Sequence, residues 1–388
     1  MRTPARVLVV FGTRPEAIKL APLVCQLRGC ADLAVKVCVT AQHREMLDQV
    51  LGLFGITPDY DLDLMQPNQG LAALSAMAMQ GLDQVLAEFQ PDLLIVQGDT
   101  TTTLVAALAA YYRRVPVFHV EAGLRTDDLL APWPEEGNRR MVTRLAARHF
   151  AATPAARDNL LGEGVPESDI RLTGNTVIDA LVWVQQYLSD TPVLQQKLGE
   201  RFPFLAGGRR MVLVTAHRRE NFGEGFQRIG QAIAELAARY PAVDFVFPVH
   251  PNPNVQEPVR HWLAHLPNVA LLQPLEYQEF VFLMGQAYLI LTDSGGVQEE
   301  APFLGKPVLL MRDCTERPEA VAAGSSRLVG TDRHKIVTSV VELLEDPARY
   351  SVMARKRELY GDGCASARIV GEIRAFLGLQ AAQEMIHA

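Results

Sequence analysis

Acidic side chains follow apolar segments in the first half of the chain, at points where the strands of a sheet would end. Asp99 follows the apolar run 93–97, Glu121 follows the run 115–120, and Glu135 opens a helix-like segment. Grouped carboxylates of this kind can serve as general acids and bases on a sugar. Taken singly, Asp99 could instead cap the next helix and Glu135 could suit a helix dipole. Their occurrence at neighbouring strand ends favours the acid/base interpretation.

Two cations lie at the junction between the first predicted strand and the first helix. The segment Phe11-Gly-Thr-Arg-Pro-Glu-Ala-Ile-Lys places Arg14 and Lys19 where they could meet an anion, although solvated surface charge explains them equally well. The segment lacks the Gly-x-Gly-x-x-Gly pattern of a dinucleotide-binding turn, so a nicotinamide cofactor gains little support.

A histidine occupies the corresponding place in the second half of the chain. His217 follows the predicted strand 211–215 and is followed by two arginines. This setting suits a residue that faces a ligand, and the alternative is a buried structural histidine.

Small residues after the strand 288–292 give the most specific local signal. Ser294, Gly295 and Gly296 would leave backbone N–H groups open to a phosphate at a helix N-terminus. Glu300, about one turn further on, could accept a hydrogen bond from a ribose, and Arg317 could clamp a diphosphate. The alternative is a plain glycine turn. The pattern therefore predicts a nucleotide-diphosphate site in the second half of the chain.

Positioning these residues requires strands that alternate with helices. We predict strands at 7–11, 35–40, 93–97, 115–120, 150–152, 211–215, 244–248, 269–272, 288–292, 307–311 and 327–329. We predict helices at 15–28, 43–54, 101–113, 134–148, 175–188, 224–239, 254–265, 277–285, 297–304 and 365–377. Continuous apolar strands between helices indicate an α/β fold with parallel sheets covered on both faces. In such sheets ligands bind beyond the carboxyl ends of the strands.

The strand–helix pattern restarts after a stretch rich in proline, glycine and polar residues. We therefore predict two Rossmann-like, doubly wound domains that face a cleft. The predicted parts are an acid/base domain at 1–174, a linker region at 175–208, a nucleotide-binding domain at 209–364, and a last helix within 365–388 that could cross back to the first domain.

Composition excludes several classes of function. The 388 residues carry 37 basic and 44 acidic side chains, a net charge of −7 that argues against a nucleic-acid binder. No apolar run reaches the roughly 18 residues of a membrane helix, and no signal peptide is evident. The five cysteines form no Cys-x-x-Cys pair and fit reduced thiols in the cytoplasm. His261 and His265 have helical spacing but no third ligand, so no metal site is predicted.

Nine segments, taken in order and spacing, resemble the non-hydrolysing UDP-N-acetylglucosamine 2-epimerases over nearly the whole chain. They are Phe11-Gly-Thr-Arg-Pro-Glu-Ala-Ile-Lys, Thr40-Ala-Gln-His-Arg-Glu-Met-Leu-Asp-Gln-Val-Leu, Gly98-Asp-Thr-Thr-Thr-Thr, His119-Val-Glu-Ala-Gly-Leu-Arg-Thr, Pro132-Trp-Pro-Glu-Glu, Thr173-Gly-Asn-Thr-Val-Ile-Asp-Ala-Leu, Ala216-His-Arg-Arg-Glu, Asp293-Ser-Gly-Gly-Val-Gln-Glu-Glu-Ala-Pro and Thr315-Glu-Arg-Pro-Glu.

The resemblance implies a GT-B-like fold, a homodimer, and interconversion of UDP-GlcNAc and UDP-ManNAc without nicotinamide or metal. The product would feed bacterial surface polysaccharides. It implies that UDP-sugar contacts come from Arg14, Lys19, Asp99, Glu121, His217, Phe280, Ser294, Gly295, Gly296, Glu300 and Arg317. It also implies that the catalytic group is Asp99, Glu121, Glu135 and His217.

Two departures limit what the resemblance carries over. Leu275 stands where enterobacterial relatives have Gln, so no side-chain hydrogen bond is transferred there. Gln42 and His43 match a second, activating UDP-GlcNAc site of some relatives, but Glu45 and Asn68 differ from it, which leaves activation open.

The implied chemistry begins at the anomeric carbon, because the C2 proton is not adjacent to a carbonyl. UDP would leave, loss of the C2 proton would give a 2-acetamidoglucal, and UDP would add again with protonation from the other face. The alternatives are a retaining GT-B glycosyltransferase, a hydrolysing epimerase that releases ManNAc, and a non-catalytic binder of nucleotide sugars.

Overall fold

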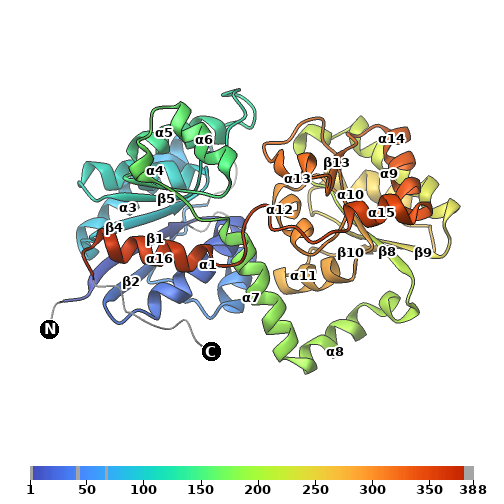
Figure 1. Ribbon diagram of the computed structural model, residues 1–388, viewed down its shortest axis with the longest axis horizontal. Coiled ribbons are helices and arrows are strands. Elements are labelled where there is room, and N and C mark those ends of the chain that lie inside the picture. Colours follow the sequence, from blue (N-terminus) through green and yellow to red (C-terminus); the bar gives the residue numbers. More distant parts are fainter. Residues whose placement is uncertain (1–2, 41–43, 66–68, 380–388) are drawn as a thin grey trace. The chain divides into compact units, whose positions relative to one another are not determined.

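The computed structural model describes residues 3–40, 44–65 and 69–379, and the chain divides into two compact units (Figure 1). Unit 1 comprises Met1–Ala180 and Tyr360–Ala388, and unit 2 comprises Leu181–Leu359. The chain passes from unit 1 to unit 2 within helix α7 (Thr176–Asp190) and returns before Tyr360. The predicted linker region 175–208 is largely helical, since α7 is followed by α8 (Pro192–Arg201).

Unit 1 is built on a seven-stranded parallel sheet with the order β3-β2-β1-β4-β5-β6-β7. Its strands are β1 (Ala5–Phe11), β2 (Leu33–Val39), β3 (Tyr60–Asp61), β4 (Leu93–Gln97), β5 (Val117–Ala122), β6 (Arg148–Ala151) and β7 (Ile170–Leu172). Besides the start of α7, its helices are α1 (Arg14–Arg28), α2 (Arg44–Leu53), α3 (Leu71–Phe89), α4 (Thr101–Tyr112), α5 (Glu135–Leu145), α6 (Pro154–Gly162) and α16 (Ala365–Phe376), with a 3-10 turn at Glu167–Asp169.

The central strands of unit 1 are apolar on both faces because helices cover both. Leu8, Leu94 and Val96 pack with α3 and α4 in one cluster of fully or nearly fully buried side chains. On the other face Phe118 of β5 meets Phe376 of α16 edge-on, with ring centroids 4.9 Å apart. The last helix therefore packs on the first unit, beside α1 (Figure 1).

Unit 2 is built on a six-stranded parallel sheet with the order β10-β9-β8-β11-β12-β13. Its strands are β8 (Arg210–Thr215), β9 (Val243–Pro248), β10 (Val269–Leu272), β11 (Leu289–Thr292), β12 (Val308–Leu310) and β13 (Ser326–Leu328). Besides α8 and the end of α7, its helices are α9 (Glu224–Arg239), α10 (Pro253–Leu263), α11 (Tyr277–Gln286), α12 (Gly295–Phe303), α13 (Glu319–Ala322), α14 (Arg333–Glu345) and α15 (Pro347–Met353), with 3-10 turns at Pro203–Gly207 and Arg219–Asn221.

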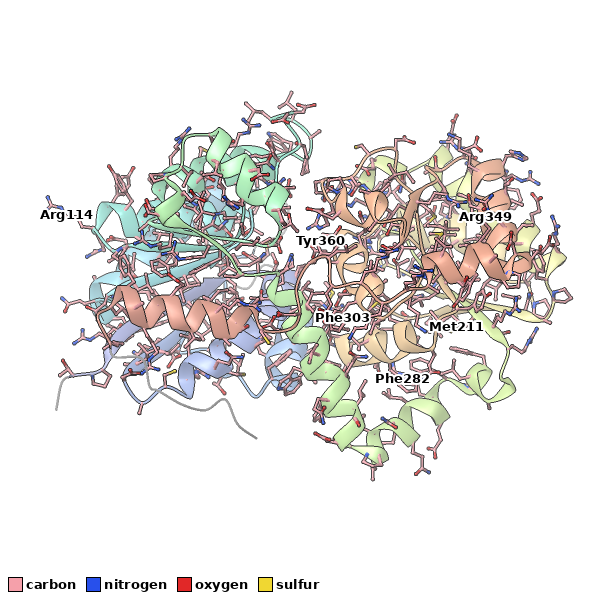
Figure 2. All side chains as sticks on the ribbon, viewed as in Figure 1. Arg114, Met211, Phe282, Phe303, Arg349 and Tyr360 are labelled. Atoms are coloured by element: carbon pink, nitrogen blue, oxygen red, sulfur yellow. The ribbon has the colours of Figure 1, made fainter. Side chains whose placement is uncertain are left out.

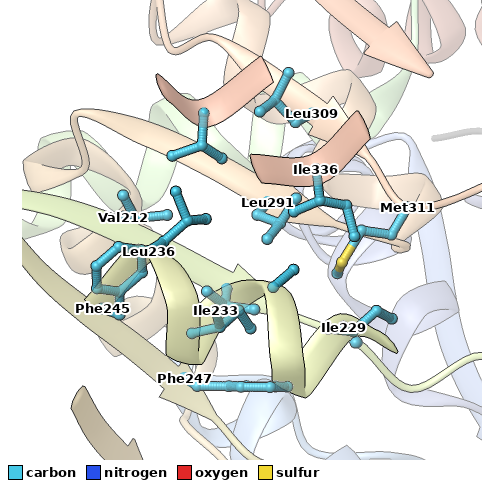
Figure 3. Close-up of a cluster of buried hydrophobic side chains, with 14 of the residues drawn as sticks. Val212, Ile229, Ile233, Leu236, Phe245, Phe247, Leu291, Leu309, Met311 and Ile336 are labelled. Carbon is cyan, nitrogen blue, oxygen red and sulfur yellow. The ribbon is translucent and has the colours of Figure 1, made fainter. Parts of the chain in front are cut away.

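Helix α9 shows how sequence spacing creates the core of unit 2. Its apolar residues Phe226, Ile229, Ile233 and Leu236 recur every three or four positions and are all fully buried. They pack against strand residues such as Phe245 in one cluster of apolar side chains (Figure 3).

Both sheets confirm the predicted α/β fold with doubly wound parallel sheets, and most predicted elements lie within a few residues of the observed ones. Strand β5 is an exception that matters, because it runs on through Glu121, which was expected to follow it. Helix α12 begins at Gly295, two residues earlier than predicted. The prediction missed helices α3, α6, α8, α13, α14 and α15 and strands β3 and β7. The buried positions Leu74, Ala78 and Leu82 of α3 nevertheless have helical spacing. No helix among the described residues is both long and apolar enough to cross a membrane.

Candidate active site

Glu121 is held in a distorted part of strand β5. The pairing of β5 with β6 shifts register between Val120 and Ala122, and Glu121 between them has φ of +60°. Such a conformation is uncommon for a residue other than glycine and is found at functional sites. The buried carboxylate forms an ion pair with Lys19 of α1 and accepts a hydrogen bond of 2.8 Å from Asn175 Nδ2. The structure thus brings together two of the predicted site residues.

Asp99 lies in the turn that follows β4. Its carboxylate forms an ion pair with Arg139 of α5, and its backbone carbonyl accepts a hydrogen bond of 2.9 Å from Asn138 Nδ2. Helix α4 is capped by Thr100, whose hydroxyl accepts from the N–H of Thr103 at 3.2 Å. Asp99 is therefore not the N-cap of that helix, which removes the simpler explanation for it.

Glu135 is the first residue of α5 and is half-buried. Its fully buried neighbour Glu136 forms two ion pairs within the helix, 3.2 Å from Arg139 Nη1 and 2.8 Å from Arg140 Nε. Because Arg139 also contacts Asp99, Glu136 fixes the guanidinium that holds Asp99. Glu136 lies in the segment Pro132-Trp-Pro-Glu-Glu, but no role was predicted for it.

Glu16 connects two of the loops that carry predicted site residues. It is buried and accepts hydrogen bonds from the N–H groups of Gly12 and Thr13, at 3.1 and 2.8 Å. It also accepts from the hydroxyls of Thr100 and Thr103, at 2.7 and 3.2 Å. Burial raises its pKa, and these donors act in the opposite direction. The capping-box spacing of Thr13 and Glu16 was visible in the sequence. The contacts to the loop after β4 were not.

In unit 2, the buried Asp293 organises the loop that carries His217. Its carboxylate accepts hydrogen bonds from the N–H of His217 at 3.0 Å, the N–H of Arg218 at 2.9 Å and Asn221 Nδ2 at 3.0 Å. His217 Nδ1 lies 3.3 Å from the same carboxylate. Partial burial lowers the pKa of His217, and Arg218 adds to this effect, whereas Asp293 opposes it. The His217 side chain is 43% exposed, so it is not the buried structural histidine that was the alternative.

The N-terminus of α12 lies beside two arginines. Ser294 is the N-cap residue, and its side chain makes no capping hydrogen bond. A Cβ placed on Gly295 would lie 3.0 Å from Arg317 Nη1 and 3.5 Å from Arg218 Nη2. A side chain at position 295 would therefore meet these guanidinium groups. The helix N-terminus and both guanidinium groups are favourable for an anion.

Carboxylates hold these guanidinium groups in place. Arg317 Nε donates to Glu299 at 2.7 Å, and Arg317 Nη1 donates to Glu316 at 2.6 Å. Glu316 also contacts Arg312 Nη1 at 2.8 Å and Arg218 Nη2 at 3.7 Å. Burial acts to raise the pKa of Glu316, but the three arginines outweigh it and hold the pKa far below its usual range.

The remaining predicted residues lie on neighbouring elements. Buried Glu300 of α12 accepts a hydrogen bond of 2.7 Å from the hydroxyl of Tyr277 on α11. A Cβ placed on Gly296 would lie 3.8 Å from Glu300 Oε2. Phe280 is half-buried on α11, and Arg14 is half-buried at the start of α1. Gln42 and His43 lie outside the described residues.

Two buried histidines lie side by side behind the loop of Asp99. His119 of β5 and His149 of β6 are paired in the parallel ladder, and His119 Nε2 lies 2.7 Å from the carbonyl oxygen of Gly98. The Nδ1 atom of each ring is buried and lacks a hydrogen-bond partner among the described residues. Burial lowers the pKa of each to about 4, and for His149 the neighbouring His119 contributes to the shift.

We expect these two histidines to lower the stability of the folded protein as the pH falls. The folded-state pKa of about 4 lies below the ordinary histidine value of 6.5, so the unfolded chain takes up protons first as the pH falls. The contribution of the two rings to the free energy of unfolding is therefore fully present above about pH 6.5. It is lost between pH 6.5 and pH 4, by about 3 kcal/mol for each ring. Urea unfolding at several pH values measures the slope. The variant with both His119→Gln and His149→Gln should have a smaller slope in this range, and an equal slope would contradict the assignment.

Within the described residues, no group of three or more His, Cys, Asp or Glu side chains could hold a metal ion. Unit 1 presents carboxylates paired with cations at its strand ends, and unit 2 presents a helix N-terminus flanked by guanidinium groups. This combination on two Rossmann-like sheets defines an α/β protein of the GT-B-like class.

Comparisons with known proteins show which family within this class the chain belongs to. A family model described as UDP-N-acetylglucosamine 2-epimerase matches residues 26–374. The UDP-N-acetylglucosamine 2-epimerase of Yersinia pestis is 58% identical over 95% of this chain and 98% of its own length, and that of Salmonella typhimurium is 56% identical over 96% and 99%. The crystal structure of UDP-GlcNAc 2-epimerase from Neisseria meningitidis bound to UDP-GlcNAc superposes with a TM-score of 0.93 at 51% identity, and covers 95% of this chain and 100% of that chain. The chain belongs to the UDP-N-acetylglucosamine 2-epimerase family.

Proposed function

We propose that the protein interconverts UDP-GlcNAc and UDP-ManNAc by eliminating UDP and adding it again. The likeness to the Neisseria meningitidis structure, which holds UDP-GlcNAc, carries the proposal. A Methanocaldococcus jannaschii UDP-GlcNAc 2-epimerase in complex with UDP-GlcNAc and UDP, 30% identical with a TM-score of 0.82, also supports it. It covers 95% of this chain and 99% of that chain. We further propose that the enzyme is a cytoplasmic homodimer that supplies surface polysaccharide synthesis.

In this proposal unit 2 holds the UDP. The N–H groups at the start of α12 and the guanidinium of Arg317 bind the diphosphate, and Glu300 binds the ribose. The proposed UDP site also includes Ser294, Gly295, Gly296 and Phe280. A diphosphate that remains bound after the C1–O bond breaks can add again, which separates epimerisation from hydrolysis.

Unit 1 supplies three of the four proposed acid/base groups, and His217 belongs to unit 2. The C1–O bond breaks first, and its electron pair leaves with the diphosphate. Removal of the C2 proton then forms the C1–C2 double bond of 2-acetamidoglucal. The diphosphate then adds again to C1, and a proton is delivered to the other face of C2, which gives the epimerised product. Asp99, Glu121, Glu135 and His217 form the proposed catalytic group, and Arg14 and Lys19 neutralise charge near it.

Product analysis in heavy water tests this function. Incubation with UDP-GlcNAc in D₂O, in EDTA and without added cofactor, should give UDP-ManNAc that carries deuterium at C2. Free ManNAc as the product would identify a hydrolysing enzyme, and transfer to an added acceptor would identify a glycosyltransferase. Protium retained at C2 of the epimerised product would exclude the elimination route.

A further inference from the structure

The two segments that connect the units meet at one point of unit 1. The N–H of Asn175, just before α7, donates to the carbonyl oxygen of Tyr360 at 2.6 Å. A Cβ on Gly174 would lie 3.0 Å from the Cα of Gly361, and both glycines have positive φ, +85° and +139°. Side chains are therefore excluded at this contact, which lies beside the buried Tyr360 labelled in Figure 2.

The same connection is fixed a second time one turn along α7. The carboxylate of Asp179 accepts hydrogen bonds from the N–H groups of Ala365 and Ser366, at 3.1 and 2.7 Å, and so caps helix α16. Arg368 of α16 donates to the carbonyl oxygen of Thr173 at 2.9 Å. The outgoing and returning segments are therefore joined on both sides of Asn175.

The side chain of Asn175 points from this junction into the candidate active site. It is 2% exposed, and its Oδ1 accepts from the N–H of Val177 at 3.1 Å in the first turn of α7. Because a backbone N–H must face the amide oxygen, the NH₂ group faces Glu121 Oε2, at 2.8 Å. Lys19 Nζ contacts the same oxygen of Glu121. One carboxylate oxygen is thus held from α1 and from the connection between the units.

We propose that Asn175 is a positioning residue for Glu121, and that it fixes this carboxylate to the junction of the two connecting segments. The inference rests on the proposed function of Glu121 in epimerisation. The amide sets the orientation of a carboxylate whose strand is already distorted at that residue. Small displacements of a catalytic group lower the rate strongly.

Two variants separate this role from the capping of α7. Asn175→Asp and Asn175→Ser both keep an oxygen that can accept from the N–H of Val177, and both remove the NH₂ donor to Glu121. We expect kcat for epimerisation and C2 proton exchange to fall about 10- to 100-fold, as for loss of a hydrogen bond to a charged group. UDP affinity by calorimetry should stay within about twofold. Asp332→Ala, which removes the N-cap of α14, is the control for loss of a cap and should keep wild-type kcat.

The pH profile gives a readout that a purely structural role would not change. The carboxyl introduced by Asn175→Asp can donate to Glu121 only when it is protonated, so the ratio of its kcat to that of the wild type should rise as the pH falls. The surrounding charged groups, Lys19, Glu121, Asp179 and Arg368, are common to both proteins and do not change the direction of this ratio.

The outcomes are distinguishable. If the wild type does not epimerise UDP-GlcNAc, the proposed function fails and this inference with it. If the wild type is active and both variants keep kcat within about threefold, the inference alone is overturned. A parallel loss of UDP affinity, or failure of both variants to fold, would show that Asn175 has a general structural role and would also overturn it.

Discussion

Replacing Asp99, Glu121 or Glu135 by the matching amide should lower kcat roughly 10²- to 10⁴-fold, the usual loss when a general acid or base is removed. The shape of the side chain is kept, while the charge that pairs with Lys19 or Arg139 is lost at two of the sites. UDP affinity should change far less, because the proposed UDP site lies in unit 2. Initial rates with UDP-GlcNAc and calorimetric titration with UDP measure the two effects separately.

A carboxylate of the same unit provides the control. Glu163 pairs with Arg125 at 2.7 Å and has no assigned part in the chemistry. The Glu163→Gln variant should therefore keep wild-type kcat. If all three active-site amides stay within about threefold of the wild type, the proposed catalytic group is wrong.

The second large effect concerns UDP itself. Gly295→Val, Glu300→Ala and Arg317→Ala should each weaken UDP binding about 10- to 100-fold, since a hydrogen bond to a charged group contributes roughly 1.5–3 kcal/mol. The structure shows what two of these changes would disturb locally. Valine at position 295 would crowd the guanidinium group of Arg317, whose Nη1 lies 3.0 Å from an added Cβ, and alanine at position 300 removes the carboxylate that accepts a hydrogen bond from Tyr277. Calorimetric titration with UDP tests all three.

Stability must be checked beside affinity for the arginine. Arg317→Ala removes a partner of buried Glu299 and Glu316, so its melting temperature should fall as well. Arg327→Ala, which breaks the more exposed pair with Glu342, is the matched control and should bind UDP normally. Wild-type affinity in all three folded variants would move the nucleotide to another site.

The sequence alone predicts those features that depend on local pattern. Apolar runs between helices led to both parallel sheets, and the small residues after β11 led to the α12 terminus. Helix α9 has the predicted bounds because its apolar spacing is unambiguous. In each case the determining residues lie within one element or one turn.

The supporting residues of the site could not be predicted in this way. Asn175 reaches Glu121 across 54 positions, and Asp293 binds the N–H of His217 across 76. Glu16 is joined to Thr100 across 84 positions. Each depends on which strands are neighbours, and strand order is not encoded in local spacing. The register shift beside Glu121 is likewise a property of the β5–β6 pairing, so the local pattern did not predict it, and the strand was expected to end with its apolar run at residue 120.

The return of the last helix to unit 1 sets the order in which the units can be completed during synthesis. Arg374 of α16 pairs with Asp32 at 2.8 Å, a contact that joins positions 342 residues apart. All of unit 2 lies between these two positions. A growing chain therefore contains every residue of unit 2 before it contains the helix that covers β5 of unit 1. Because domains generally fold as units during synthesis, the unit that is made first is the one that is finished last.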